Sequence, residues 1–123
     1  MKKLLLVGLM MLAGSAWAEW VMFSDSDSGT SYFDPATIRK EGNMRRVWEL
    51  QDLRKRGKND EMSRRLRKEY DCKQERSRFL GMSGHSESMA LGTVLWTVGE
   101  ETQWDAVAPG TNREAILEIV CAK

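Results

Sequence analysis

The stretch Arg64-Arg65-Leu66-Arg67-Lys68-Glu69-Tyr70-Asp71-Cys72 decides the fold, because its side chains alternate in character. Leu66, Tyr70 and Cys72 fall on one face, and the opposite face takes Arg65, Arg67, Glu69 and Asp71. This alternation is typical of a strand in an antiparallel sheet with one solvated face. A helix over 61–70 is the alternative, since Arg, Glu and Leu all favour helix. The alternation and the position of Cys72 on the apolar face favour the strand.

Further strands are expected on both sides of this stretch, as short apolar or β-branched runs between turns. The longest is 44–53, with Met44, Trp48 and Leu50 on one face and Arg45, Glu49 and Gln51 on the other. The run 91–98 is rich in Val, Thr, Leu and Trp, which predicts a strand buried on both faces. A turn is expected at 83–87. The remaining extended segments are 19–23, 30–33, 37–39 and 76–82.

One helix is predicted near the C-terminal end of the sequence. Thr111-Asn112-Arg113-Glu114 has the pattern of a capping box, in which the Thr and Glu side chains each accept a hydrogen bond from a backbone amide. An apolar stripe follows at helical spacing, formed by Ala115, Ile116, Ile119 and Val120. Cys121 lies within a turn of this stripe.

Cys72 and Cys121 are the only cysteines, so a single intramolecular pairing exists. The bridge would close a loop of 50 residues. On the chain-entropy estimate it contributes about 4 kcal/mol of stability. Half of a metal site is the alternative, but His85 is the only histidine and no Cys-x-x-Cys spacing exists. We predict an α+β fold, an antiparallel sheet of about five to six strands with one C-terminal helix held on its inner face by the disulfide.

Residues 1–18 have the zones of a secretory signal peptide. A basic start and an apolar run precede Ala16-Trp17-Ala18, which places small residues one and three positions before a cut between Ala18 and Glu19. The apolar run is shorter than the about 20 residues of a membrane span. Ser15 stands where a lipoprotein signal would have its lipidated cysteine. The sequence predicts a signal peptide at 1–18 and a domain at 19–123, periplasmic or secreted, with no lipid anchor and no membrane span.

Charge is distributed unevenly along the predicted domain. Positions 39–78 contain 15 Lys and Arg against 8 Asp and Glu, whereas the rest of 19–123 contains 2 against 10. A basic surface of this kind can bind polyanions such as sulfated glycans or lipopolysaccharide. The simpler interpretation is internal, with the acidic terminal segments folded beside the basic strands. The candidate partner-binding residues are the outward arginines and the basic loop, namely Arg45, Arg65, Arg67, Arg54, Lys55, Arg56 and Lys58.

The sequence contains no recognisable catalytic or cofactor-binding motif. It has neither a glycine-rich phosphate loop nor a Gly-x-Ser-x-Gly motif, and one His with two paired Cys makes neither a Cys–His dyad nor a metal site. We predict a protein that is not an enzyme and uses no cofactor or metal. His85 is interpreted as a solvated loop residue. Trp48 and Trp96 are interpreted as core, whereas Trp20 and Trp104 fit either a core or a stacking role.

Several stretches, taken in order, carry a family resemblance. The most specific is Ser31-Tyr32-Phe33-Asp34-Pro35-Ala36-Thr37-Ile38-Arg39. It is followed by Val47-Trp48-Glu49-Leu50 and Glu69-Tyr70-Asp71-Cys72, and the set is completed by Trp20, Gly42, Met89, Gly92, Trp104 and Val120-Cys121. The chain resembles the surface-adhesin protein E-like family of small bacterial exported proteins. The resemblance implies a compact antiparallel sheet with a C-terminal helix tied to it by the cysteine pair. It also implies adhesion to host matrix and serum proteins.

These observations predict a non-enzymatic exported binding domain, adhesin-like, that recognises a protein or polyanionic partner through its surface. We expect no nucleic acid as ligand. One alternative is a periplasmic protein inhibitor, for example of lysozyme, with an exposed loop at 81–89 entering its target, or another cell-envelope factor. A small hydrolase is a further alternative. The sequence leaves the identity of the partner and the oligomeric state open.

Overall fold

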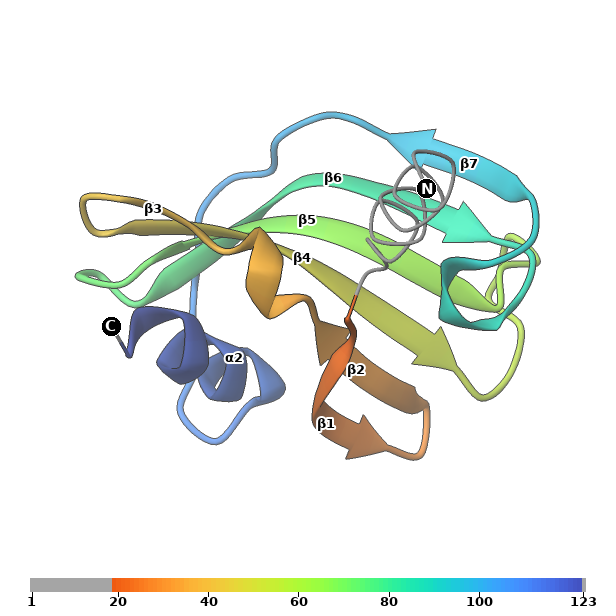
Figure 1. Cartoon of the computed structure of the whole chain (residues 1–123), viewed down its shortest axis with the longest axis horizontal. Helices are drawn as coiled ribbons and strands as arrows, with labels where there is room; N and C mark the ends of the chain where they lie inside the picture. Colours follow the sequence, from red (N-terminus) through yellow and green to blue (C-terminus); the bar gives the residue numbers. More distant parts are fainter. Residues whose placement is uncertain (1–18, 123) are drawn as a thin grey trace, which may run out of the picture.

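The structure, a computed structural model, describes residues 19–122. The predicted signal peptide at 1–18 lies outside the described residues. Strands and one helix form two layers (Figure 1). The strands are β1 (Val21–Ser26), β2 (Gly29–Phe33), β3 (Arg39–Glu41), β4 (Met44–Leu53), β5 (Ser63–Asp71), β6 (Arg76–His85), β7 (Val94–Val98) and β8 (Asp105–Ala106). The helix is α2 (Asn112–Cys121), and two short 3₁₀ turns are η1 (Pro35–Thr37) and η2 (Ser88–Ala90).

The strands form one antiparallel sheet in the order β1-β2-β4-β5-β6-β7. Two short strands extend it, since β3 pairs with β4 and β8 pairs with β6. Gly42 adopts a positive φ of 58° in the turn between β3 and β4, a conformation that glycine adopts without steric cost. The predicted fold class is confirmed, and so is the strand at 64–72, which excludes the alternative helix.

The register between β4 and β5 separates two faces of the sheet. Val47 pairs with Lys68 and Arg45 pairs with Tyr70, and paired residues point to the same side. Val47 and Tyr70 pack against the helix, so this side is called the covered face. The opposite side, called the open face, takes the alternate residues of the same strands, among them Arg46, Trp48, Arg65, Arg67 and Glu69.

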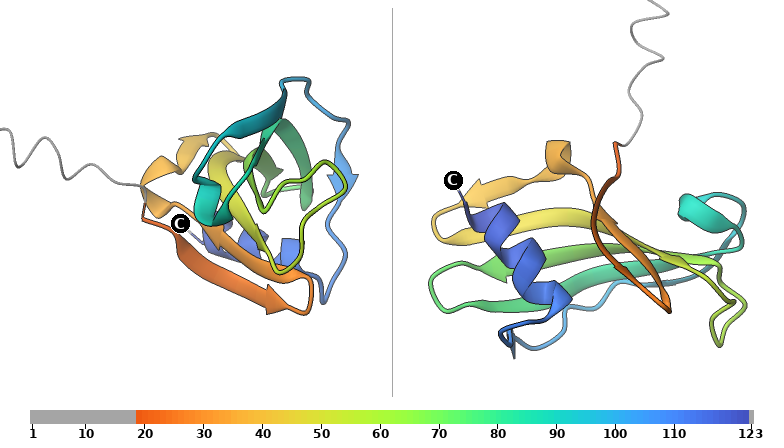
Figure 2. Two further views of the ribbon diagram at one scale, coloured as in Figure 1. Left: turned by 90° about the vertical axis from the view of Figure 1, so that its right-hand side faces the viewer. Right: turned by 90° about the horizontal axis from the view of Figure 1, so that it is seen from below.

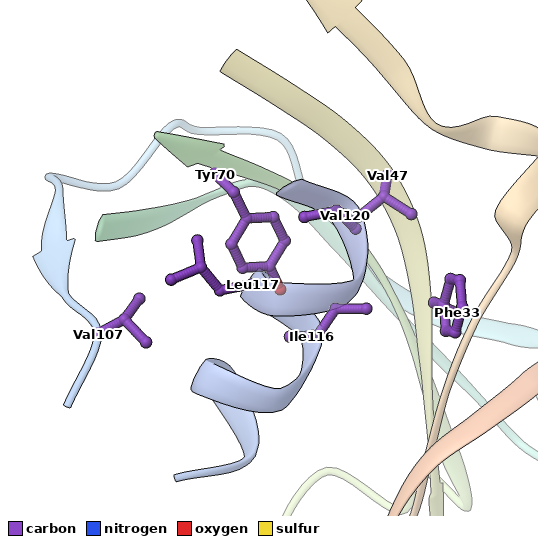
Figure 3. Close-up of a cluster of buried hydrophobic side chains, with 7 residues drawn as sticks. All are labelled: Phe33, Val47, Tyr70, Val107, Ile116, Leu117 and Val120. Atoms are coloured by element: carbon purple, nitrogen blue, oxygen red, sulfur yellow. The ribbon is translucent and has the colours of Figure 1, made fainter. Parts of the chain in front are cut away.

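The helix α2 lies across part of the covered face (Figures 1 and 2). The Thr111 hydroxyl accepts a hydrogen bond from the Glu114 amide, which confirms the predicted N-terminal cap. The buried helical residues are Ile116, Leu117 and Val120, which face Val47 and Tyr70 in the core (Figure 3). Ile119 is 41% exposed, so Leu117 replaces it in the apolar stripe that the sequence predicted. The buried stripe of the helix is therefore rotated from the expected one, and Val107 packs beside Leu117.

The disulfide between Cys72 and Cys121 ties the end of β5 to the end of α2. Their Cα atoms are 5.7 Å apart. The predicted disulfide is confirmed. It links the sheet and the helix covalently on the covered face, where the alternation placed Cys72.

Trp48 and Trp96 are only half-buried, and neither belongs to the core cluster. In β4 the covered face takes Arg45, Val47 and Glu49, so Trp48 lies on the opposite side. The prediction that these two tryptophans form the core is wrong. Val47, a smaller apolar residue whose side chain points to the covered face, occupies the core position.

The strand β7 differs from its prediction as well. It is the last strand of the sheet, and no described strand pairs with its outer edge. Val94 is 52% exposed and Val98 is 51% exposed, so the expectation of a strand buried on both faces is wrong. Because β7 lies at the edge of the sheet, no further strand packs beside its β-branched side chains, and they stay exposed.

The strand β6 runs further than predicted, through His85, because β5 begins at Ser63 and pairs with His85. His85 is buried, and its Nε2 lies 2.8 Å from the Ser83 hydroxyl. Burial, and after it the charge of Arg65, lowers the pKa of His85. The interpretation of His85 as a solvated loop residue is therefore wrong, and so is the expected turn at 83–87.

The segment after β6 folds back over one end of the open face. The Ser63 hydroxyl donates to the Glu87 carbonyl and accepts from the Ala90 amide, and the Met89 amide donates to Asp52. Leu50 is fully buried on this part of the face. The exposed loop expected at 81–89 is therefore partly strand and partly a segment packed on the sheet.

Candidate functional site

Trp48 lies at the centre of the uncovered part of the open face. Arg67 is its register partner on β5, and the Arg65 guanidinium carbon lies 4.7 Å from the centre of a Trp48 ring. Arg65 and Arg67 are both exposed. A guanidinium stacked on an indole keeps its edge free for hydrogen bonds, so this pair presents a flat surface with donors around it.

Two hollows flank Trp48, each of about 300 Å³. The first is bordered by Arg39, Arg46 and Arg67, with η1 on its other side. The second lies between Trp48 and Trp20, with Arg65 and Asp34 at its edge. The segment containing η1 forms these hollows because β2 ends at Phe33 and β3 begins at Arg39, which leaves the edge of β4 open at Val47 and Trp48. The Trp48 amide donates to the Thr37 hydroxyl there.

An ion-pair ladder continues the open face beyond Trp48. Glu69 accepts from Arg46 at 3.0 Å and from Arg78 at 2.6 Å, and Asp71 accepts from Arg76 at 2.9 Å. Burial acts to raise the pKa of Glu69, but Arg78 and Arg46 outweigh it and lower that pKa. The Asp71 pKa is also lowered, because the hydrogen bonds to this buried carboxylate outweigh its burial.

Trp104 covers the end of this ladder. The guanidinium carbons of Arg76 and Arg78 lie 4.6 and 4.5 Å from the centre of its ring. Arg78 also reaches Glu101 at 3.4 Å. Trp104 therefore has a stacking role rather than a place in the core, and its arginines are already engaged by carboxylates.

Arg39 and Arg67 differ from the arginines of the ladder. Within residues 19–122 neither makes an ion pair, and both are exposed beside the first hollow. The acidic terminal segments do neutralise part of the basic region, since Asp25 pairs with Arg54 and Glu101 with Arg78. They leave the cations around Trp48 available for another molecule.

The predicted partner-binding residues fall in three separate places. Arg65 and Arg67 lie on the open face. The basic loop, with Arg54, Lys55, Arg56 and Lys58, lies at the exposed tip between β4 and β5. Arg45 is buried on the covered face and donates to the carbonyls of Gly42 and Met44, so its interpretation as an outward arginine is wrong. Arg45 lies two residues before Val47 in β4, so its side chain points to the same face of the sheet as Val47, which packs against the helix.

Sequence reasoning missed Arg39 and Arg46 and assigned Trp48 to the core. A signal was available, because the turn at Gly42 pairs Arg39 with Arg46 across the hairpin. Once Trp48 is assigned to the open face of β4, this pairing places the two cations Arg39 and Arg46 next to it.

The described residues contain no cluster of three or more His, Cys, Asp or Glu able to hold a metal ion. In the same part of the chain no helix is long and apolar enough to span a membrane. What remains at the site is a rigid sheet face that carries arginine and tryptophan. Its side chains offer charges, hydrogen-bond donors and aromatic rings.

The described chain is a small disulfide-tied antiparallel sheet with a polar open face. The family described as Surface-adhesin protein E matches residues 20–122, nearly all of the described chain. This chain belongs to that family, and the predicted resemblance is confirmed. It is therefore an adhesin-like protein of the exported or surface type.

Solved structures of Haemophilus influenzae protein E share the fold. Crystal form II is 14% identical with a TM-score of 0.70, over 88% of this chain and 91% of that one. The selenomethionine form is 13% identical with a TM-score of 0.69, over 88% and 89%. Protein E from a non-typeable strain is 16% identical with a TM-score of 0.60, over 82% and 75%. No curated protein matches the sequence. At these identities the likeness supports the fold alone.

Proposed function

We propose that this protein is a non-enzymatic adhesin-like binding domain whose open face recognises an anionic group on a partner molecule. The observation that carries the proposal is the group formed by the half-buried Trp48 and the exposed Arg65 and Arg67, beside two hollows. Family membership supports the general role of adhesion.

The chemistry of this group favours carboxylates and sulfates. A guanidinium binds either group through two parallel hydrogen bonds, which makes arginine more selective than lysine for such ligands. Arg67 has no ion-pair partner within residues 19–122, so a ligand need not displace a carboxylate from it. The ring of Trp48 holds the neighbouring Arg65 flat and reduces the entropy that it loses on binding.

Export belongs to the same proposal. An adhesin acts outside the cytoplasm, and residues 1–18 have the pattern of a signal peptide with cleavage between Ala18 and Glu19. We propose that the mature protein begins at Glu19 and, with Ser15 in place of a lipidated cysteine, carries no lipid.

The test uses heparin as a sulfated probe, immobilised on a biosensor, with the purified mature protein in solution. The double variant Arg65→Glu/Arg67→Glu is expected to bind at least about tenfold more weakly, because it replaces two donors by like charges. Binding of the unchanged protein should fall as salt rises from low to moderate concentration. The conservative double variant Arg65→Lys/Arg67→Lys is expected to bind at an intermediate level, since it keeps charge and loses the planar fork.

The control is Lys55→Glu/Lys58→Glu, which makes the same change in net charge at the tip between β4 and β5. Both lysines are exposed and lie away from the Trp48 group. We expect this variant to retain most of the binding. An equal loss in both double reversals would mean that net charge rather than the open face drives binding, and absence of binding at low salt would overturn the proposal altogether.

A further inference from the structure

A hollow of about 230 Å³ lies on the covered face, where the N-terminal half of α2 leaves the sheet. Its apolar walls are Phe23, Leu66, Phe79 and Ile116. Figure 2 shows that α2 covers only part of this face, so the sheet beyond the first helical turn is not covered by the helix. The hollow shares Ser31, Gln51 and Asn112 with a larger polar depression of about 650 Å³, which gives it a route to solvent.

Lys68 lines this hollow and is the feature that calls for a ligand. The residue is 6% exposed, and its Nζ lies 5.1 Å from the ring centres of both Tyr70 and Phe79. Among residues 19–122 no acceptor takes a hydrogen bond from this ammonium and no carboxylate forms an ion pair with it. The Nζ atom is not sealed from solvent, so the three donors of this ammonium are open to water or to a ligand that enters the hollow.

Glu49, a buried carboxyl group that lines the same hollow, interacts with the charge of Lys68 but forms no ion pair or hydrogen bond with it. It is 5% exposed and accepts a hydrogen bond from the Tyr70 hydroxyl. Burial raises the pKa of Glu49, although the charge of Lys68 and the Tyr70 hydrogen bond act against this. Arg113, at the rim, is half-exposed and reaches Asp105 at 3.2 Å. A ligand in this hollow would therefore meet the Lys68 ammonium together with the Glu49 carboxyl, whose raised pKa favours its neutral form.

We infer that this hollow binds a small organic carboxylate with a compact apolar body. The carboxylate would accept hydrogen bonds from the Lys68 ammonium, with Arg113 at the rim adding positive charge. The apolar body would contact Phe23, Phe79 and Ile116. Pairing a buried cation with a desolvated anion that also hydrogen-bonds to it is the arrangement in which a buried ion pair is favourable. The site is on the opposite side of the sheet from the Trp48 group and does not depend on the proposed adhesive function.

The experiment is a titration of the mature, ¹⁵N-labelled protein with 3-phenylpropanoate, followed by amide resonances. Two other probes separate the requirements: 3-phenylpropanamide keeps the apolar body without the charge, and propanoate keeps the charge with almost no body. We expect 3-phenylpropanoate to shift the resonances of Lys68, Phe79 and Arg113, and to bind at least about tenfold more tightly than either other probe.

The variant Lys68→Met removes the ammonium and keeps the length of the side chain, and it is expected to abolish the preference for the acid over the amide. Lys73→Met, at an exposed lysine, serves as the matched control and should leave that preference unchanged. Equal affinity for acid and amide in the unchanged protein would overturn the inference, and so would shifts confined to the open face. This comparison needs no variant, so the inference stays testable even if Lys68→Met fails to fold. Arg65→Glu/Arg67→Glu should bind 3-phenylpropanoate normally, which separates failure here from failure of the adhesive proposal.

Discussion

The covered face and the open face are formed by the same three long strands, yet they differ in what buries their side chains. On the covered face Val47 and Tyr70 are buried against Ile116 and Val120 of the helix. On the open face Glu69 is just as deeply buried, but the residues that cover it are the arginines on either side. The covered face is closed by apolar contact and a disulfide, whereas around Glu69 the open face is closed by ion pairs.

This difference separates stability from recognition. Removal of apolar area from water is the main favourable contribution to folding, whereas an ion pair with an exposed arginine contributes little. Arg46 of the ladder is 45% exposed in its side chain, so its pair with Glu69 is screened by solvent. Variants of the covered face should therefore change the free energy of unfolding strongly, and variants around Trp48 should change binding while leaving stability nearly intact.

The largest effect is expected from the disulfide. The double variant Cys72→Ala/Cys121→Ala should lose about 4 kcal/mol in the free energy of unfolding, since its unfolded chain no longer has a closed loop. Urea denaturation of the unchanged and variant proteins measures this difference. Intact mass of the protein from periplasmic extracts should show two hydrogens gained on reduction and a chain that begins at Glu19.

Reduction of the unchanged protein is the control, and it should bring its urea midpoint close to that of the double variant. Two free thiols in the periplasmic protein, or an unchanged midpoint in the variant, would show that the covered face does not rely on this bridge.

A smaller loss is expected from the helix. Ile116 is 1% exposed, so Ile116→Ala should cost about 3 kcal/mol through lost burial and the cavity left behind. Ile119→Ala on the same helix is the matched control, because Ile119 is 41% exposed and should cost at most about 0.5 kcal/mol. Urea denaturation of the two variants measures the contrast. Equal losses would mean that the helix presents the stripe that the sequence predicted, with Ile119 in the core.

The part of the fold that sequence reasoning predicted depends on local signals. Alternation over 64–72 needs only the two-residue period of a strand, and the cap at Thr111 needs only the residues of one helical turn. The cysteine pair then determines where the helix meets the sheet. These three features suffice for the fold class, whereas the family resemblance rests on the ordered stretches that begin with 31–39.

What sequence reasoning missed depends on tertiary neighbours. In β4 both faces carry apolar residues, Val47 on one and Trp48 with Leu50 on the other, so parity alone does not show which face the helix covers. The position of β7 at the edge of the sheet, and the burial of His85, follow from strand order, which no local pattern encodes. The candidate site was predicted only in part for the same reason. Alternation along the strand predicts the outward position of Arg65 and Arg67. The position of Arg39 and Arg46 beside Trp48 depends instead on how β3 and β4 pair in a hairpin.

The smallest of the expected effects is a pH dependence in which the two faces act in opposite directions. The pKa values of Glu69 and Asp71, on the open face, are lowered from their ordinary values of 4.5 and 3.8. Their stabilising contribution is complete above those values and is lost as pH falls through the lower values of the folded state. The pKa of Glu49, on the covered face, is raised from 4.5. The folded state therefore takes up its proton first, which adds stability as pH falls toward 4.5.

Urea denaturation at a series of pH values, from neutral to strongly acidic, tests this opposition. Glu69→Gln should flatten the acidic decline, because the titrating partner of Arg46 and Arg78 is gone. Glu49→Gln, which keeps an acceptor for the Tyr70 hydroxyl, should leave the acidic decline in place and remove the gain above pH 4.5. If Glu69→Gln lost stability in acid in parallel with the unchanged protein, Glu69 would not contribute to the acidic decline. The ion pairs of Glu69 would then only position the side chains of Arg46 and Arg78 on the open face.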